Sequence, residues 1–271
     1  MTTPPPRLLA ALDRFHTARP WDHNAHYHRW IMRQIPKRFG TALDIGSGSG
    51  DLARLLGTRA GSVRGLDADP AIVARARGLT APDAPVAFSV GDALTDIPSG
   101  CYDVITCVAA LHHLPFSDAL GVFRRHLAPG GTLVVVGLAR PQSAGDRLLG
   151  AVAVPLNVAM AWIRNRGRRS ARPVSMTAPT RPAVMSFADI AREARQALPG
   201  ARLRRRVFWR YTLVWHQNRP APQGSSRTAK AAADREEAPS SSARTGAAPG
   251  PRGVRRRRRP SHVCRGATAN R

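Results

Sequence analysis

Apolar positions in the first half of the chain fall into two alternating patterns. Short runs rich in apolar residues predict strands, and they lie at residues 41–45, 62–66, 86–90, 102–108 and 133–136. Apolar residues spaced three or four positions apart predict helices between these strands, at residues 52–56, 71–77 and 117–127. Strands and helices therefore alternate along this part of the chain.

The segments on either side of this region have other patterns. Residues 7–19 have the spacing of an amphipathic helix, and residues 28–34 predict a second helix. Between them, residues 21–28 are dense in side chains that can hydrogen-bond and stack. Toward the other end, residues 186–198 predict a helix, and residues 201–216 alternate as expected of a hairpin of two strands.

A glycine-rich loop follows the first predicted strand. Gly46, Gly48 and Gly50 occupy every second position, and the helical spacing starts at Leu52. Glycine allows a sharp turn and a close approach of a ligand because it has no Cβ. The helix after the loop would direct its first N–H groups at a bound group. Asp44, two residues before the first glycine, is placed to receive a cationic group.

Charge is unevenly distributed in this chain of 271 residues, which has a net charge of +25. Residues 1–139 hold 14 basic and 11 acidic side chains (net +3), residues 140–217 hold 15 and 3 (net +12), and residues 218–271 hold 13 and 3 (net +10). Enzymes that act on nucleic acids more often carry basic charge around the catalytic core as well. The distribution therefore disfavours a nucleic-acid substrate.

From residue 218 onward the composition shifts to Ala, Pro, Gly, Ser and Arg, with a run of arginines at residues 255–259. This composition predicts a disordered tail, which either binds RNA or an acidic surface or has no selected role. The N-terminus lacks a secretory pattern, and the three cysteines show neither metal-ligand spacing nor a disulfide framework. We therefore expect a reducing, cytoplasmic location.

Five landmarks in order make the chain resemble the class I S-adenosylmethionine-dependent methyltransferases. They are the acidic-x-Gly-x-Gly-x-Gly loop from Asp44, the acidic Asp67 after the second strand, Gly91-Asp92-Ala93 after the third, Tyr-Asp-Val-Ile from Tyr102 in the fourth, and Leu-Ala-Pro-Gly-Gly from Leu127 before the fifth. The resemblance covers about residues 41–138. It implies a Rossmann-like α/β fold whose seven-stranded, mostly parallel sheet has helices on both faces and an antiparallel last strand.

The same resemblance implies a domain organisation and a cofactor. A helical cap is expected at residues 1–40, the methyltransferase core at 41–217 with an insertion at about 141–182, and the basic tail at 218–271. S-adenosyl-L-methionine is the implied cofactor, and no metal is required. The implied cofactor-binding residues are Asp44, Gly46, Ser47, Gly48, Gly50, Asp67, Ala68, Asp92, Ala93, Val108 and Tyr27.

Individual roles follow from the family pattern. The two carboxylate oxygens of Asp67 suit the two ribose hydroxyls of an adenosine, whereas Asp69 is expected to cap the next helix. Asp92 would accept a hydrogen bond from the exocyclic amine of adenine, unless it only closes a turn. Tyr27 and His26 are placed near the methionine end of the cofactor, with the alternative that they pin the N-terminal helices to the core.

His112 and His113 follow the fourth strand, at the edge where ligands bind in open α/β sheets. A histidine there can act as a general base because its ordinary pKa lies near neutrality. The alternative is that these side chains only position a loop. We expect that alternative for at least one of them, and His113 is the better candidate for catalysis.

The apolar run at residues 147–163 contains Pro155 and Asn157 and is shorter than the ~20 residues of a standard membrane span. Three roles remain open for it. It is a lid over the substrate pocket, as in methyltransferases with inserted substrate elements, or a helix on an anionic membrane surface, or a core helix. Arginines follow it directly, at Arg164, Arg166, Arg168 and Arg169.

The sequence favours methylation of a small, apolar metabolite. It lacks the Asn/Asp-Pro-Pro-Tyr tetrapeptide of enzymes that methylate exocyclic amines, and it lacks the paired-glutamate loop of arginine methyltransferases. The segment Leu-His-His-Leu from Leu111 resembles that of quinone-biosynthesis enzymes. The alternatives are an RNA methyltransferase guided by its basic segments and a non-catalytic cofactor-binding protein. The protein is expected to be a monomer or a dimer.

Overall fold

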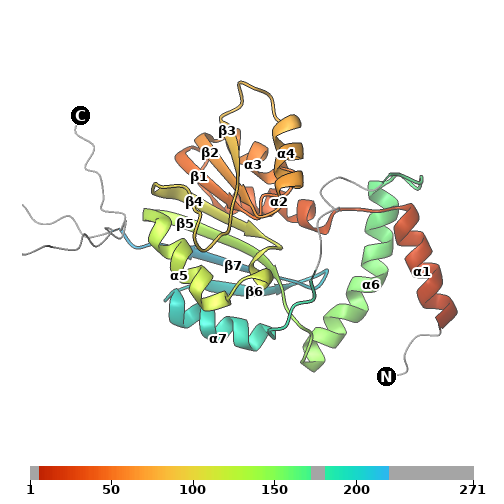
Figure 1. Cartoon of the computed structure of the whole chain (residues 1–271). Helices are drawn as coiled ribbons and strands as arrows, with labels where there is room; N and C mark the ends of the chain where they lie inside the picture. The colour runs from red at the N-terminus through yellow and green to blue at the C-terminus, as the bar shows by residue number, and fades with distance from the viewer. Residues whose placement is uncertain (1–5, 172–180, 220–271) are drawn as a thin grey trace, which may run out of the picture. The chain divides into compact units, whose positions relative to one another are not determined.

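The computed structural model describes residues 6–171 and 181–219 of the chain. Its centre is a seven-stranded sheet in the order β3-β2-β1-β4-β5-β7-β6 (Figure 1). Most of the tail expected at residues 218–271 lies outside the described residues. The strands are β1 Phe39–Ile45, β2 Ala60–Asp67, β3 Val86–Val90, β4 Tyr102–Val108, β5 Leu127–Leu138, β6 Arg202–Arg206 and β7 Arg210–His216.

Strand direction confirms the predicted fold class. Strands β1 to β5 pair in parallel, whereas β7 runs antiparallel to β5, from Thr132 opposite His216 to Leu138 opposite Arg210. Strand β6 pairs antiparallel with β7 in the expected hairpin, so β7 is the strand of reversed direction. Parallel strands need crossover connections. Helices lie in three of the four connections between β1 and β5, and the loop of residues 91–101 joins β3 to β4.

Helices cover both faces of the sheet, and α1 and α6 lie beside it (Figure 1). The helices are α1 Pro6–Ala18, α2 His23–Gln34, α3 Asp51–Gly57, α4 Pro70–Gly78, a short 3₁₀ helix Leu111–His113, α5 Phe116–His126, α6 Ala144–Arg164 and α7 Phe187–Ala197. Successive side chains of a strand point to opposite faces. Accordingly, Val135 of β5 packs in the core with α5 and α7, whereas Val134 and Val136 pack in the core with α2, α3 and α4.

Helix α6 is longer than the apolar run in the sequence indicated, because its ends are set by polar residues. Ser143 and Asp146 form a capping box that starts the helix, and the helix continues through Pro155 to Arg164. It packs on α1 and contributes Ala161 to a small core with Trp21 and Phe208. This small core joins α6 to the segment before α2 and to the turn between β6 and β7.

Candidate active site

The glycine loop connects β1 to α3 at the carboxyl edge of the sheet. Gly46 has a φ of 65°, and a Cβ on it would lie 2.3 Å from the Cβ of Ala110. The residue must therefore be glycine for two reasons, its left-handed backbone and the close approach of the segment after β4. Gly46 and Ser47 both donate backbone hydrogen bonds to the Leu66 carbonyl at the end of β2.

A cleft of about 600 Å³ opens along this loop at the carboxyl ends of β1, β2, β3 and β4. This is the edge at which open α/β sheets bind their ligands. The cleft brings together nine of the expected site residues: Gly46, Ser47, Gly48, Asp67, Ala68, Asp92, Ala93, Val108 and His113. Four expected residues do not line it: Asp44, Gly50, Tyr27 and His112.

Asp67 at the end of β2 is tied to the glycine loop. One carboxylate oxygen accepts a hydrogen bond from the Gly48 N–H at 2.8 Å, and the other accepts from the Asp69 N–H at 3.1 Å. Each carboxylate oxygen has capacity for a second donor, so the side chain can still receive two hydroxyl groups. As expected, Asp69 caps α4 by accepting a hydrogen bond from the Ala71 N–H at 2.8 Å.

Asp92 at the end of β3 takes part in a tight turn. Its carboxylate accepts a hydrogen bond from the Leu94 N–H at 2.6 Å, and its own N–H donates to Asp96 at 2.8 Å. The side chain therefore has the turn role that was the alternative in the sequence, while it also lines the cleft beside Ala93. The two roles are compatible, because one carboxylate oxygen is sufficient for the turn.

Asp44 lies behind the loop, with only 2% of its surface exposed. Thr106 of β4 donates its hydroxyl to the Asp44 carboxylate at 2.7 Å. Burial raises the pKa of Asp44 to about 7, and the negative charge of Asp67 adds to that effect. Asp44 therefore acts on a ligand in the cleft only through its charge and through the loop that it supports.

His113 and His112 differ in where they lie. Their rings are 4.0 Å apart between centroids, but only His113 lines the cleft. Burial lowers the pKa of His113, and the charge of Arg181 adds to this; burial, His113 and Arg210 lower the pKa of His112 to about 4. Both imidazoles are therefore neutral near pH 7. The low pKa of His112 makes that ring a weak proton acceptor, and His113 is the one that a bound molecule can reach.

Tyr27 does not line the cleft and instead holds α2 to the core, which was the alternative role expected for it. The Tyr27 hydroxyl donates to the Val207 carbonyl at 2.8 Å, and the side chain is buried away from the cleft. Asp22, Asn24 and His28 line the cleft instead. The density of polar and aromatic residues at 21–28 identified this segment, but it gave no indication of which side of the helix faces the cleft.

Arg181 is a lining residue that had no signal in the sequence, because it belongs to a loop far along the chain from the glycine motif. It lies close enough to His113 for its charge to lower the pKa of that imidazole. Among the described residues that line the cleft, it is the one arginine or lysine.

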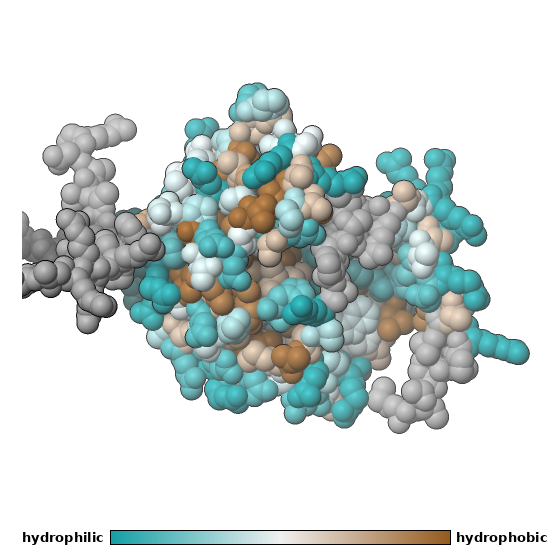
Figure 2. All heavy atoms as spheres, in the orientation of Figure 1, coloured by the Kyte–Doolittle hydropathy of each residue, from teal (hydrophilic) through white to brown (hydrophobic). Residues whose placement is uncertain are grey.

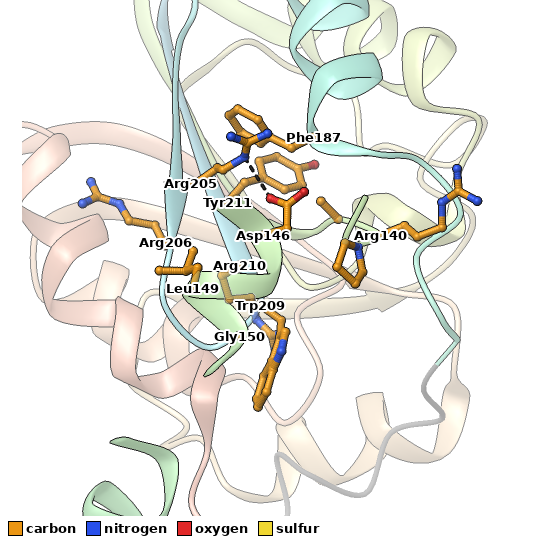
Figure 3. A pocket seen from close by; sticks show the side chains of 12 residues that line it. Arg140, Asp146, Leu149, Gly150, Phe187, Arg205, Arg206, Trp209, Arg210 and Tyr211 are labelled. Atoms are coloured by element: carbon orange, nitrogen blue, oxygen red, sulfur yellow. Dashed lines mark ion pairs between the residues drawn. The ribbon is translucent and has the colours of Figure 1, made fainter. Parts of the chain in front are cut away.

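A second, smaller hollow lies between the start of α6 and the β6–β7 hairpin (Figure 3). Asp146 points at Arg205 across it and forms an ion pair of 3.0 Å. The side chains of Arg140 and Arg206 point away from each other on opposite sides (Figure 3). These two arginines therefore do not point at a common ligand. The ion pair between Asp146 and Arg205 holds α6 to β6.

The shape of the cleft and its polar groups suit an adenosine-containing cofactor. Ser47 Oγ is buried at the cleft without a hydrogen-bond partner in the described part of the chain. A Cβ built on Gly48 would meet nothing within 4 Å, so the loop leaves open space on its ligand side. The carboxylates of Asp67 and Asp92 stand at the ends of neighbouring strands, where ribose hydroxyls and an adenine amine would need acceptors.

Comparison with known proteins agrees with this geometry. The family described as "Methyltransferase domain" matches residues 43–135. An uncharacterized methyltransferase of Mycobacterium tuberculosis is 29% identical over 198 residues, which is 72% of this chain and 96% of that protein. A demethylmenaquinone methyltransferase of Thermus thermophilus is 38% identical over 120 residues, 40% of this chain and 53% of that protein.

Solved structures show the same fold. The N-methyltransferase NodS of Bradyrhizobium japonicum superposes with a TM-score of 0.50 at 16% identity, covering 72% of this chain and 96% of NodS. The complex of DhpI with S-adenosylhomocysteine gives 0.50 at 19% identity, covering 78% and 93%. The sheet order and the fold are those of Rossmann-like methyltransferases. Residues 43–135 match the methyltransferase domain, and the chain is similar to a methyltransferase over 72% of its length.

Proposed function

We propose that this chain is an S-adenosylmethionine-dependent methyltransferase that acts on a small, apolar acceptor, which enters the cleft at the His113 end. The observation that carries the proposal is the charge of the cleft. Five aspartates line it, and within residues 6–171 and 181–219 Arg181 is the one arginine or lysine of the lining. Carboxylates favour a cationic cofactor and repel the phosphates of a nucleic acid. The aspartates are Asp22, Asp51, Asp67, Asp69 and Asp92.

The lining near His113 supports an apolar acceptor. Val108, Ala109, Ala110 and Leu114 surround the histidine at the end of β4. An acceptor that lacks charge would lose little hydration against these side chains. Two relatives of partial coverage are named for quinone biosynthesis, a demethylmenaquinone methyltransferase and a ubiquinone biosynthesis O-methyltransferase. A quinol-like ring is therefore the first acceptor to test.

Each residue of the cleft then has a definite task. When bound, S-adenosylmethionine supplies a methyl carbon that is electrophilic because it is attached to a sulfonium. Asp67 would accept hydrogen bonds from the ribose hydroxyls, Asp92 would accept one from the adenine amine, and the backbone of the glycine loop would hold the cofactor beside them. Neutral His113 accepts the proton that the acceptor hydroxyl loses. The remaining task of the protein is to align the two reactants and exclude water.

The test uses the full-length protein and measures cofactor binding first. Calorimetric titration should show binding of S-adenosylmethionine and none of NAD. Methyl transfer is then followed with a labelled cofactor, a panel of hydroxylated quinols, and total RNA as the competing acceptor. We expect label on a quinol. Label on RNA alone, with a steep loss of activity as salt rises, would replace the proposal with the RNA alternative.

His113→Gln and His112→Gln form a matched pair for the catalytic assignment. Loss of a general base typically lowers turnover by 10²–10⁴-fold, so we expect a fall of about 100-fold or more for His113→Gln, with cofactor affinity preserved. His112→Gln should have a much smaller effect, because this ring does not line the cleft. Cofactor binding without transfer to any acceptor would favour the non-catalytic alternative.

We propose the cytoplasm as the location of the protein.

A further inference from the structure

Helix α6 has its apolar side turned outward. The side facing the protein consists of Ala153, Asn157 and Ala161, all of them buried. The opposite side carries large apolar residues that are between 37% and 68% exposed. They are Leu148, Val152, Leu156, Trp162 and Ile163. A surface helix of a globular protein normally has the reverse arrangement, with its apolar stripe toward the core.

These five exposed residues, here called the α6 stripe, form one continuous band. Leu148, Val152 and Leu156 are spaced by four residues, and Ile163 follows seven residues later. Residues at these spacings lie on one side of an α-helix. From Leu148 to Ile163 the band is about 22 Å long at 1.5 Å per residue. Figure 2 shows hydrophobic side chains gathered near α6 and bordered by hydrophilic ones.

The helix is fixed in this orientation by polar contacts on its inner side. Asn157 accepts a hydrogen bond from Trp21 Nε1 at 2.6 Å and lies 2.8 Å from His23 Nε2. At the start of the helix, Asp146 pairs with Arg205 (Figure 3). Rotation of α6 to bury the stripe would break these contacts and leave buried polar groups unpaired, which is costly. These contacts therefore fix the apolar side of α6 in its outward orientation.

Charge at the ends of the stripe indicates what covers it. Residues 141–171 contain five arginines and one acidic residue, Asp146, whose charge is already paired with Arg205. All five arginines are exposed, and Trp162 lies where the stripe meets four of them. Cationic residues beside an apolar face, with a Trp at the junction, suit the boundary between lipid headgroups and acyl chains. The arginines are Arg147, Arg164, Arg166, Arg168 and Arg169.

We propose that α6 docks this protein on an anionic lipid bilayer, with the α6 stripe in the interfacial layer and the arginines on lipid phosphates. Among the described residues, α6 is the one helix long and apolar enough to cross a membrane by length and composition. Its inner side is nevertheless packed on α1 and bonded through Asn157, so it lies on the bilayer rather than across it. The proposal is independent of the acceptor.

Vesicle flotation of the full-length protein tests this. Vesicles of phosphatidylcholine with phosphatidylglycerol should carry the protein upward, and vesicles of phosphatidylcholine alone should carry much less. The double variant Leu156→Ser/Ile163→Ser should lower the partition coefficient at least roughly tenfold, because apolar side chains no longer enter the interface. The double variant Arg166→Gln/Arg168→Gln should lower it several-fold on anionic vesicles only.

A matched control removes apolar surface elsewhere. Leu79 and Val90 are 51% and 46% exposed, and neither belongs to α6. Leu79→Ser/Val90→Ser should float like the wild type, and every variant should keep wild-type thermal unfolding and S-adenosylmethionine binding. Equal flotation of the stripe variant and the wild type would overturn the proposal. So would failure to float combined with a dimer that the stripe substitutions convert to monomer, because the stripe would then be a subunit interface.

Discussion

Replacing Gly46 by alanine tests whether the glycine loop is fixed by backbone conformation, by close packing, or by both. An alanine at a φ of 65° costs about 1–2 kcal/mol, and the loss of backbone freedom in the unfolded state returns about half of that. In addition, the new Cβ would lie 2.3 Å from the Ala110 Cβ. Overlap in a packed site typically costs about 1–3 kcal/mol. We therefore expect Gly46→Ala to lower the free energy of unfolding by about 2–4 kcal/mol.

Two companion variants separate the contributions. Gly48 also has a left-handed backbone, with a φ of 51°, but its Cβ would meet nothing within 4 Å. Gly48→Ala should therefore cost only about 1 kcal/mol. In the Gly46→Ala/Ala110→Gly variant the overlap is removed, since the next atom, Ala110 Cα, is 3.7 Å away. Stability should then return toward that of Gly48→Ala.

Urea unfolding provides the free energies, and calorimetric titration of S-adenosylmethionine reports whether the cleft is intact. Equal losses of stability in Gly46→Ala and Gly48→Ala would refute the packing argument. So would a failure of Ala110→Gly to restore any stability to Gly46→Ala.

Three further expectations concern the carboxylates of the cleft and the contact that fixes α6. Asp67→Ala should weaken S-adenosylmethionine binding at least roughly tenfold in calorimetry, because two acceptor oxygens and the bond to the loop are lost; unchanged affinity would remove its ribose role. In the folded protein the pKa of Asp44 is raised to about 7. Protonated Asp44 therefore stabilises the fold at low pH, and this contribution is lost as pH rises from the unfolded pKa to about 7. The free energy of unfolding should fall by up to about 4 kcal/mol over that range. Urea unfolding at pH values across that range should show this decline, and Asp44→Asn should flatten it. Asn157→Leu leaves the Trp21 and His23 side chains without their partner and should lower the unfolding free energy by about 1–3 kcal/mol, measured by thermal unfolding.

The parts of the molecule that the sequence predicted well are local. The strand, glycine loop and helix around Gly46 need only neighbouring residues, and Asp67 and Asp92 follow directly from the strand ends. The roles that were missed depend on contacts between distant segments. Tyr27 is turned toward Val207, 180 residues away in the chain. Arg181 lines the cleft although it lies far along the chain from the glycine loop.

Helix α6 shows the same limit in another form. Its apolar residues predicted a helix, but burial of Asn157 and exposure of the α6 stripe could not be predicted from hydrophobicity. The contacts of Asn157 with Trp21 and His23 determine which side faces the protein. A polar residue in an apolar helix is thus a better guide to orientation than the apolar residues around it.

Strand β6 forms an edge of the sheet that is protected against pairing with another molecule. As the last strand in the order, it has one side without a neighbouring strand, and such an edge can recruit another chain. Four of its five residues are arginines, and three of these are exposed. A second molecule that tried to extend the sheet would bring its own β6 arginines against them. Part of the unusual basicity of this chain therefore protects this edge of the sheet from pairing with another chain.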